Sequence, residues 1–144
     1  MARLVRGLAI VLAVALVMAC GVATREARPT TLANTVWRAV SVDGQATIAG
    51  SEPTARFMIT DANGSSGCND WFSPFTYDPS SGRIVFQQLA MTARGCSNPA
   101  LEPIERAFSD VLVAVTDASI DSTGRLVLSG SRGDIVLEVD AVGG

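Results

Sequence analysis

Apolar and polar residues alternate with a period of two along much of the chain after residue 34. This alternation is typical of strands that bury one face, and turn signals rich in Gly, Asp, Asn, Pro and Ser separate the alternating stretches. The pattern predicts strands over 35–42, 54–60, 65–68, 75–77, 83–87, 125–129 and 135–139, a hairpin turn over 61–64 and a loop over 45–53. Short strands at regular spacing favour a closed or nearly closed antiparallel sheet.

The period changes to that of a helix beyond residue 100. Apolar residues then fall on one helical face, at Leu101, Ile104, Phe108, Val111, Leu112 and Val115. Glu102 and Glu105 belong to the opposite, polar face. Pro103 fits only the first turn, where its missing N–H breaks no hydrogen bond, so the helix is expected to begin near residues 100–101, with Asn98 as a candidate for an earlier cap. We therefore predict a mainly β (α+β) fold: a small antiparallel, barrel-like sheet with one amphipathic α-helix packed on it.

The beginning of the chain differs from the rest in composition. Residues 1–6 are short and basic, residues 7–17 form an unbroken apolar run, and Cys20 follows soon after. This layout is typical of a secretory signal. Its end resembles the lipobox of bacterial lipoproteins, which implies that Cys20 is lipidated on its sulfur and becomes the mature N-terminus. The alternatives are an ordinary signal peptide and a membrane helix, which needs about 20 apolar residues.

This pattern predicts three regions along the chain. A lipoprotein signal peptide is expected over 1–19, a flexible tether over 20–31 and one globular domain over 32–142. The protein would then be exported and lipid-anchored in the cell membrane or the outer membrane, with its domain outside the cytoplasm.

Composition excludes several classes of function. The chain has 144 residues, no histidine and a formal net charge of −3. Without histidine a Ser-His-Asp or Cys-His site cannot form, and the commonest metal ligand is missing. An acidic domain without a basic cluster is a poor candidate for binding nucleic acid. We therefore expect no catalytic residues, no metal site, no cofactor and no nucleic-acid partner.

Cys68 and Cys96 are the cysteines that remain once Cys20 is assigned to the anchor. In an exported protein two such cysteines are expected to form a disulfide, and the alternative is two buried thiols. The bond would close a loop of about 28 residues and would stabilise the domain by about 3–4 kcal/mol. The next residue, Asn69, is expected to hydrogen-bond the backbone of a turn, and the alternative is a ligand contact.

Four aromatic residues follow within a short span, at Trp71, Phe72, Phe75 and Tyr77. Core packing is the expected role of these side chains, and the alternative is the floor of an aromatic pocket. Together with Asn69, the residues Trp71 and Tyr77 are therefore the candidates for ligand binding.

Several of these residues, in this order, resemble the META domain family, the HslJ-like heat-shock lipoproteins. The resemblance is carried by Leu-Ala-Asn-Thr-Val-Trp at 32–37, Gly-Cys-Asn at 67–69, Leu89, Thr92 and Cys96, and Glu-Arg-Ala-Phe at 105–108 with Leu112. It departs from the family at Ser73, where Gly is common, and at 94–95, where Met-Ala is common. The resemblance implies a small, mainly β domain with a helix, often carried on envelope lipoproteins linked to stress response, antibiotic tolerance or motility. The resemblance implies no catalytic residues for this chain.

These observations favour a membrane-anchored, non-enzymatic lipoprotein that serves in envelope maintenance or stress response. Its partners would be the membrane, through the lipid on Cys20, and an unknown envelope protein or small ligand. Two alternatives stay open. A lipocalin-like binder of small ligands would have a hollow apolar interior, whereas an inhibitor or partner of another envelope protein would have an exposed apolar patch.

Overall fold

The computed structural model describes residues 27–140. The expected signal peptide and Cys20 lie outside the described residues. The elements within that range are β1 (Thr35–Val42), β2 (Gln45–Ala46), β3 (Thr54–Phe57), β4 (Asp61–Ser65), β5 (Asp70–Asp78), β6 (Arg83–Phe86), β7 (Ala90–Met91), the 3-10 turn η1 (Pro99–Leu101), α1 (Glu102–Leu112), β8 (Val115–Ile120), β9 (Leu126–Gly130) and β10 (Gly133–Val139). None of the helices between residues 27 and 140 has the length and apolar character needed to cross a membrane.

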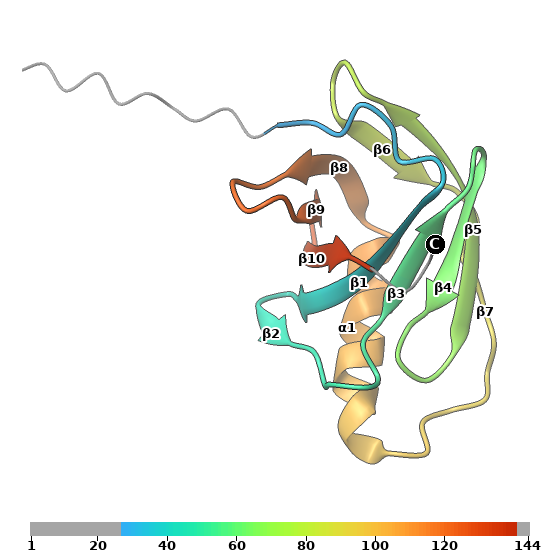
Figure 1. Ribbon diagram of the computed structural model, residues 1–144. Coiled ribbons are helices and arrows are strands. Elements are labelled where there is room, and N and C mark those ends of the chain that lie inside the picture. The colour runs from blue at the N-terminus through green and yellow to red at the C-terminus, as the bar shows by residue number, and fades with distance from the viewer. Residues whose placement is uncertain (1–26, 141–144) are drawn as a thin grey trace, which may run out of the picture.

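The sheet closes into a barrel because its first and last strands pair. Among residues 27–140, eight strands run antiparallel in the order β1-β3-β4-β5-β6-β8-β9-β10, and β10 pairs again with β1 from Trp37↔Val139 to Val42↔Ile135 (Figure 1). The two-residue strands β2 and β7 add to β1 and β5. The expected mainly β, barrel-like fold with one helix is thereby confirmed.

Alternation along the strands fills the interior of the barrel with side chains. In β5 the inward positions Trp71, Ser73 and Phe75 are buried, whereas Phe72 between them is 45% exposed. The ring of Phe57 lies with its centroid 5.2 Å from that of Phe75, in an edge-on arrangement that aromatic pairs prefer. These large side chains, joined by Phe86 and Phe108, form one continuous core.

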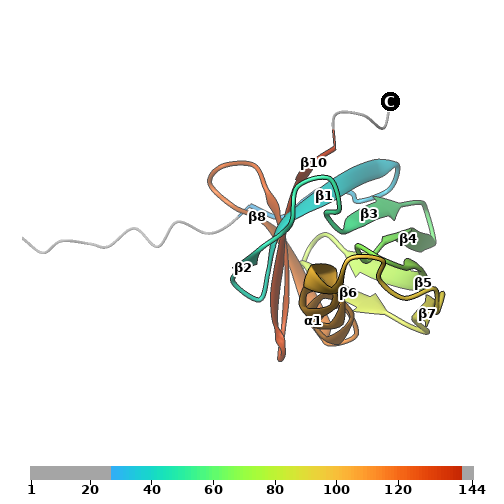
Figure 2. The ribbon, with the colours of Figure 1, turned by 90° about the horizontal axis from the view of Figure 1, so that it is seen from below.

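Helix α1 packs its apolar stripe on the sheet, as its sequence period predicts. Phe108 is 1% exposed, and its ring centroid lies 6.0 Å from that of Trp71. Figure 2 shows α1 on the concave side of the sheet, between β8–β10 and β5–β7. The side chain of Asn98 caps the turn before α1 by accepting a hydrogen bond from the N–H of Ala100 at 3.0 Å.

One expected member of the helical stripe lies in a strand instead. Val115 is buried, but α1 ends at Leu112 and Val115 begins β8, where it pairs with Gly130. A Cβ atom on Gly130 would lie 1.9 Å from the carbonyl oxygen of Ala114, so the glycine lets the chain leave the helix in close contact with β9. Val115 follows Val111 by four residues, so its spacing fits the apolar stripe of the helix although it belongs to a strand. The predicted stripe was therefore one residue too long.

The predicted hairpin turn over 61–64 is wrong. These residues form most of β4, and the chain turns earlier, between β3 and β4. Gly64 has an extended backbone here, and a Cβ atom on it would lie 2.0 Å from the carbonyl oxygen of Thr54. A glycine is therefore needed at this position because the two strands approach closely, and not because the backbone has a positive φ angle.

The elements near residues 61–64 also differ from the prediction. The expected strand over 65–68 is wrong, because the chain bends at 66–69 to enter β5. The expected short strand over 75–77 is the end of the nine-residue β5. The expected loop over 45–53 includes β2, which pairs with the end of β1.

The last part of the expected tether lies against the barrel. Ala27 forms a bridge with Ile120, and the guanidinium of Arg28 donates a hydrogen bond to the carbonyl oxygen of Ser80 at 3.0 Å. Tyr77 donates its O–H to the carbonyl oxygen of Pro29 at 2.6 Å. These contacts place 27–29, the described end of the expected tether, against the barrel.

Candidate functional site

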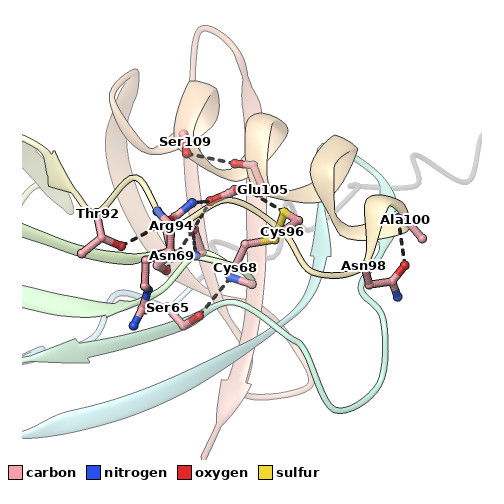
Figure 3. Close-up of a disulfide and its surroundings, with 12 residues drawn as sticks. Ser65, Cys68, Asn69, Thr92, Arg94, Cys96, Asn98, Ala100, Glu105 and Ser109 are labelled. Atoms are coloured by element: carbon pink, nitrogen blue, oxygen red, sulfur yellow. Dashed lines mark hydrogen bonds between the residues drawn. A yellow bond between two sulfur atoms is a disulfide. The ribbon is translucent and has the colours of Figure 1, made fainter.

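The Ser66–Asn69 turn joins β4 to β5 and carries the first cysteine of the expected pair. The turn closes through a hydrogen bond from the N–H of Ser66 to the carbonyl oxygen of Asn69 at 2.7 Å, and Gly67 has a φ of 109°. Cys68 forms a disulfide with Cys96, as expected, and their Cα atoms lie 4.9 Å apart (Figure 3). The separation lies within the usual range of about 4.4–6.8 Å for disulfides. The bond joins this turn to the segment that leads into α1.

Asn69 connects three separate segments with one side chain that is 7% exposed. Its Oδ1 atom accepts hydrogen bonds from the hydroxyl of Thr92 at 3.1 Å and from the N–H of Arg94 at 2.6 Å. Its Nδ2 atom donates to the carboxylate of Glu105. The amide thus holds the β4–β5 turn, the chain after β7 and the first turns of α1 together. These side-chain bonds reach other segments instead of the turn backbone that the sequence led us to expect as the partner.

Glu105 is the member of this cluster that the sequence assigned to the polar face of the helix. Its Oε1 atom also accepts from the hydroxyl of Ser66 at 3.0 Å, and its Oε2 atom lies 3.1 Å from the sulfur of Cys96. A disulfide sulfur carries no proton, so the second contact is not a hydrogen bond. A carboxylate in the first turns of a helix also interacts favourably with the helix dipole.

The outer rim of the site is held by Asp70 and Arg94. The guanidinium of Arg94 lies 2.7 Å from a carboxylate oxygen of Asp70, but both side chains are 61% exposed, so this ion pair adds little stability. Thr92 holds the rim through two hydrogen bonds with Asp70. Its hydroxyl accepts one from the N–H of Asp70 at 3.0 Å, and its own N–H donates the other to the carbonyl oxygen of Asp70. The pairing extends the short β7 alongside the beginning of β5.

The structure separates the other two candidate binding residues from Asn69. Trp71 is 2% exposed in the core, and its indole N–H donates to the carbonyl oxygen of Thr54 at 2.9 Å. Tyr77 lies near the far end of β5, where it bonds Pro29, and burial raises the pKa of its hydroxyl. The three residues therefore do not line one pocket, and the aromatic rings contribute to packing.

A surface depression of about 410 Å³ lies beside the disulfide. Its lining is formed by Asn69, Gly95, Cys96, Glu102, Glu105, Arg106, Ser109 and Asp110. Ligand atoms of Cys68, Cys96 and Glu105 lie within 4.8 Å of one another, but a thiolate, not a disulfide sulfur, ligates metals. In the oxidised protein the depression therefore presents carboxylates and one guanidinium to solvent.

Sequence reasoning found the cysteines and Asn69 but missed Glu105 and the backbone of Arg94 as their partners. Helical period alone places Glu105 on a polar face, and a polar face can lie against another segment as well as against water. The signal that could have found Glu105 was its place in the run 105–108, which is part of the family resemblance.

Two solved structures resemble this fold. An NMR structure of a protein from Burkholderia xenovorans is 22% identical, with a TM-score of 0.58, and the match covers 76% of this chain and 84% of that chain. A second NMR structure is 23% identical, with a TM-score of 0.58, and the match covers 74% of this chain and 89% of the other. At these identities the likeness concerns the fold alone.

Comparison with curated proteins finds no match. The family model described as META domain matches residues 30–142, which is most of the chain and includes the disulfide, Asn69 and Glu105. The resemblance noted in the sequence is thereby confirmed. The chain belongs to the META domain family.

Proposed function

We propose that this protein is an exported, lipid-anchored META domain protein that works in the cell envelope by binding rather than by catalysis. The observation that carries the proposal is the Cys68–Cys96 disulfide. Disulfides persist in oxidising compartments and are rare in the cytosol, so the bond agrees with the secretory pattern of residues 1–19. Cys20, at the end of that pattern, would then carry the lipid that holds the protein at the cell membrane or the outer membrane.

A non-enzymatic role is supported by how the polar groups of the site are used. Oδ1 and Nδ2 of Asn69 both bond other parts of the chain, and both carboxylate oxygens of Glu105 contact Ser66, Asn69 or Cys96. Catalytic groups must instead reach a substrate. The cluster is therefore best explained as a clamp that gives the domain a rigid surface for envelope maintenance or a stress response.

A partner-binding role, such as inhibition of another envelope protein, is the second candidate. Phe72 is 45% exposed on the outer wall of β5, next to the disulfide-bearing turn, and Val85 on β6 is 39% exposed. Aromatic residues at a surface are favoured in protein interfaces. A lipocalin-like binder is supported less, because Phe57, Phe75 and Phe86 occupy the interior that a ligand would need.

Fractionation of cells that produce the Cys20→Ala variant tests the proposed anchor. The wild-type protein should sediment with membranes, whereas the variant should be released or retained with an uncleaved leader. A matched control is the Cys68→Ala/Cys96→Ala double variant, which keeps Cys20 and should stay in the membrane fraction. Equal membrane association of the wild type and the Cys20→Ala variant, each with its leader removed, would rule the lipid anchor out.

A further inference from the structure

The two ends of the barrel differ in what they carry. The residues 27–33, the β3–β4 turn and the β5–β6 turn lie at one end, which we name the anchor end (Figure 1). The Ser66–Asn69 turn and the beginning of α1 lie at the opposite end, which we name the disulfide end. A surface depression lined by Thr30, Leu32, Ile59 and Tyr77 brings the first of these segments beside the β3–β4 turn.

The sequence also limits how far the proposed lipid can lie from the anchor end. Cys20 is seven residues before Ala27, which pairs with Ile120. A chain of that length spans at most about 25 Å when fully extended, and a flexible one averages about 15 Å. The nine residues of β5 alone rise about 30 Å. The disulfide end could therefore face the bilayer only if 20–27 ran almost fully extended along the barrel.

The docking of 27–29 is built into the domain. Gly82 has a φ of 79°, and a Cβ atom on it would lie 2.9 Å from Nε of Arg28. The glycine thus leaves the space that the arginine side chain occupies when its guanidinium bonds Ser80. The point where the chain joins the barrel is consequently fixed by side-chain packing.

Apolar side chains project from the same end. Ile59 is 78% exposed, more than any other large apolar residue described, and its neighbour Met58 is 40% exposed. Single exposed apolar residues are common on proteins, but these two lie at the tip of the turn beside the segment that leads to Cys20. Charges of both signs lie at this end, Asp61 and Asp78 at the strand ends and Arg28 and Arg83 beside the β5–β6 turn, so its attraction to a bilayer would be apolar rather than electrostatic.

We infer that the anchor end faces the bilayer, with Met58 and Ile59 in the headgroup region, and that the disulfide end points away from the membrane. This inference rests on the proposed lipidation of Cys20. Shallow burial of a few apolar side chains adds to the membrane affinity of a lipid anchor. The orientation would leave Phe72 and the depression beside Glu105 accessible to a partner outside the membrane.

Depth-dependent fluorescence quenching tests the orientation. The lipidated protein is reconstituted into phosphatidylcholine vesicles that contain nitroxide-labelled lipid, as the Ile59→Trp variant and as a matched control, Ala100→Trp, at the disulfide end. Both sites are exposed, so neither substitution should disturb folding. The native Trp37 and Trp71 are 6% and 2% exposed, and their signal is subtracted with the wild-type protein.

The fluorescence of the tryptophan added at Ile59 should lose most of its intensity and shift to shorter wavelength, whereas the tryptophan added at Ala100 should keep its intensity. Equal quenching of the two variants, or stronger quenching of Ala100→Trp, would overturn the orientation. Mass spectrometry on the same sample separates the two ideas. Failure of the quenching pattern with an acylated Cys20 contradicts the orientation alone, whereas an unacylated Cys20 contradicts the proposed function on which it rests.

Discussion

Asn69 is the side chain through which the turn, the chain after β7 and the helix are joined. Replacing it by alanine leaves the N–H of Arg94 and the carboxylate of Glu105 without their buried partner. A buried polar group that loses its partner costs about 1–3 kcal/mol. The Asn69→Ala variant should therefore lose about that much free energy of unfolding in urea titrations.

A matched control for this variant is Asn63→Ala, because Asn63 is half-buried on β4. Substitutions of this kind usually change stability by less than about 0.5 kcal/mol. Similar urea midpoints for the two variants would show that Asn69 contributes no more than a half-buried amide outside the cluster.

Asp78 makes the stability of the β5–β6 turn depend on pH in the acidic range. Hydrogen bonds from the hydroxyls of Ser80 and Ser81 lower the pKa of Asp78 from 3.8 to about 2. Because the pKa is lower in the folded state, the stability that these bonds add is present above pH 3.8 and is lost as the pH falls towards about 2. An NMR titration should give a pKa near 2 in the wild type and a higher one in Ser80→Ala. A wild-type pKa near 3.8 would contradict the turn geometry.

Gly64 and Glu105 show why single residues limited the prediction from sequence. An Asn-Gly pair fits a tight turn by its local chemistry, yet Gly64 is needed because the backbone of Thr54 lies against it. Glu105 fits a solvent-facing helix position, yet the Ser66–Asn69 turn covers it. Both facts depend on segments distant in the sequence, and local patterns do not report such contacts.

Helix α1 is the element whose packing makes the clearest prediction. Phe108 is 1% exposed and contacts Trp71, so Phe108→Ala should lower the free energy of unfolding by about 3–5 kcal/mol, as large core truncations do. Val113, the residue that follows the last residue of this helix, is 53% exposed, and Val113→Ala should change stability by less than about 0.5 kcal/mol. Equal urea midpoints for the two variants would mean that the helix buries a different face.

The elements with a clear period were predicted well and the others poorly. The strand 35–42 and the stripe from Ile104 to Leu112 agree with the structure because burial on one face imposes a regular pattern. The strand expected over 54–60 ends at Phe57, and the chain turns at 58–60. Met58, Ile59 and Thr60 are strand-forming residue types and carry no turn signal, whereas the Asn-Gly pair at 63–64 does, so the turn was placed too late. The pairing of 61–65 with β5 fixes its true position.

The disulfide acts at the scale of the whole molecule, since it joins the β4–β5 turn to the entrance of the helix. The two cysteines are 28 residues apart, and closing a loop of that size stabilises a protein by about 3–4 kcal/mol. Reduction should therefore lower the melting temperature but leave a cooperative transition, because the barrel has a continuous core. The Cys68→Ala/Cys96→Ala variant should not respond to reductant, and an unchanged melting temperature of the wild type would count against the clamp.

Closure of the barrel was predicted from strand spacing, but its register was not. The pairing of β1 with β10 depends on residues about a hundred positions apart, and the segment 27–29 has no apolar period that would reveal its contacts with the barrel. The compartment, by contrast, was predicted from one local pattern, the apolar run that ends near Cys20, and the disulfide was expected as a consequence of export.

Mass spectrometry of the protein extracted from membranes without reduction, and unfolded with a thiol-alkylating reagent, tests the central claim most directly. We predict a mature chain that begins with acylated Cys20 and in which Cys68 and Cys96 remain unalkylated because they are bonded to each other. A chain that keeps its leader, or one in which both Cys68 and Cys96 are alkylated, would contradict an exported, disulfide-clamped domain held at a membrane.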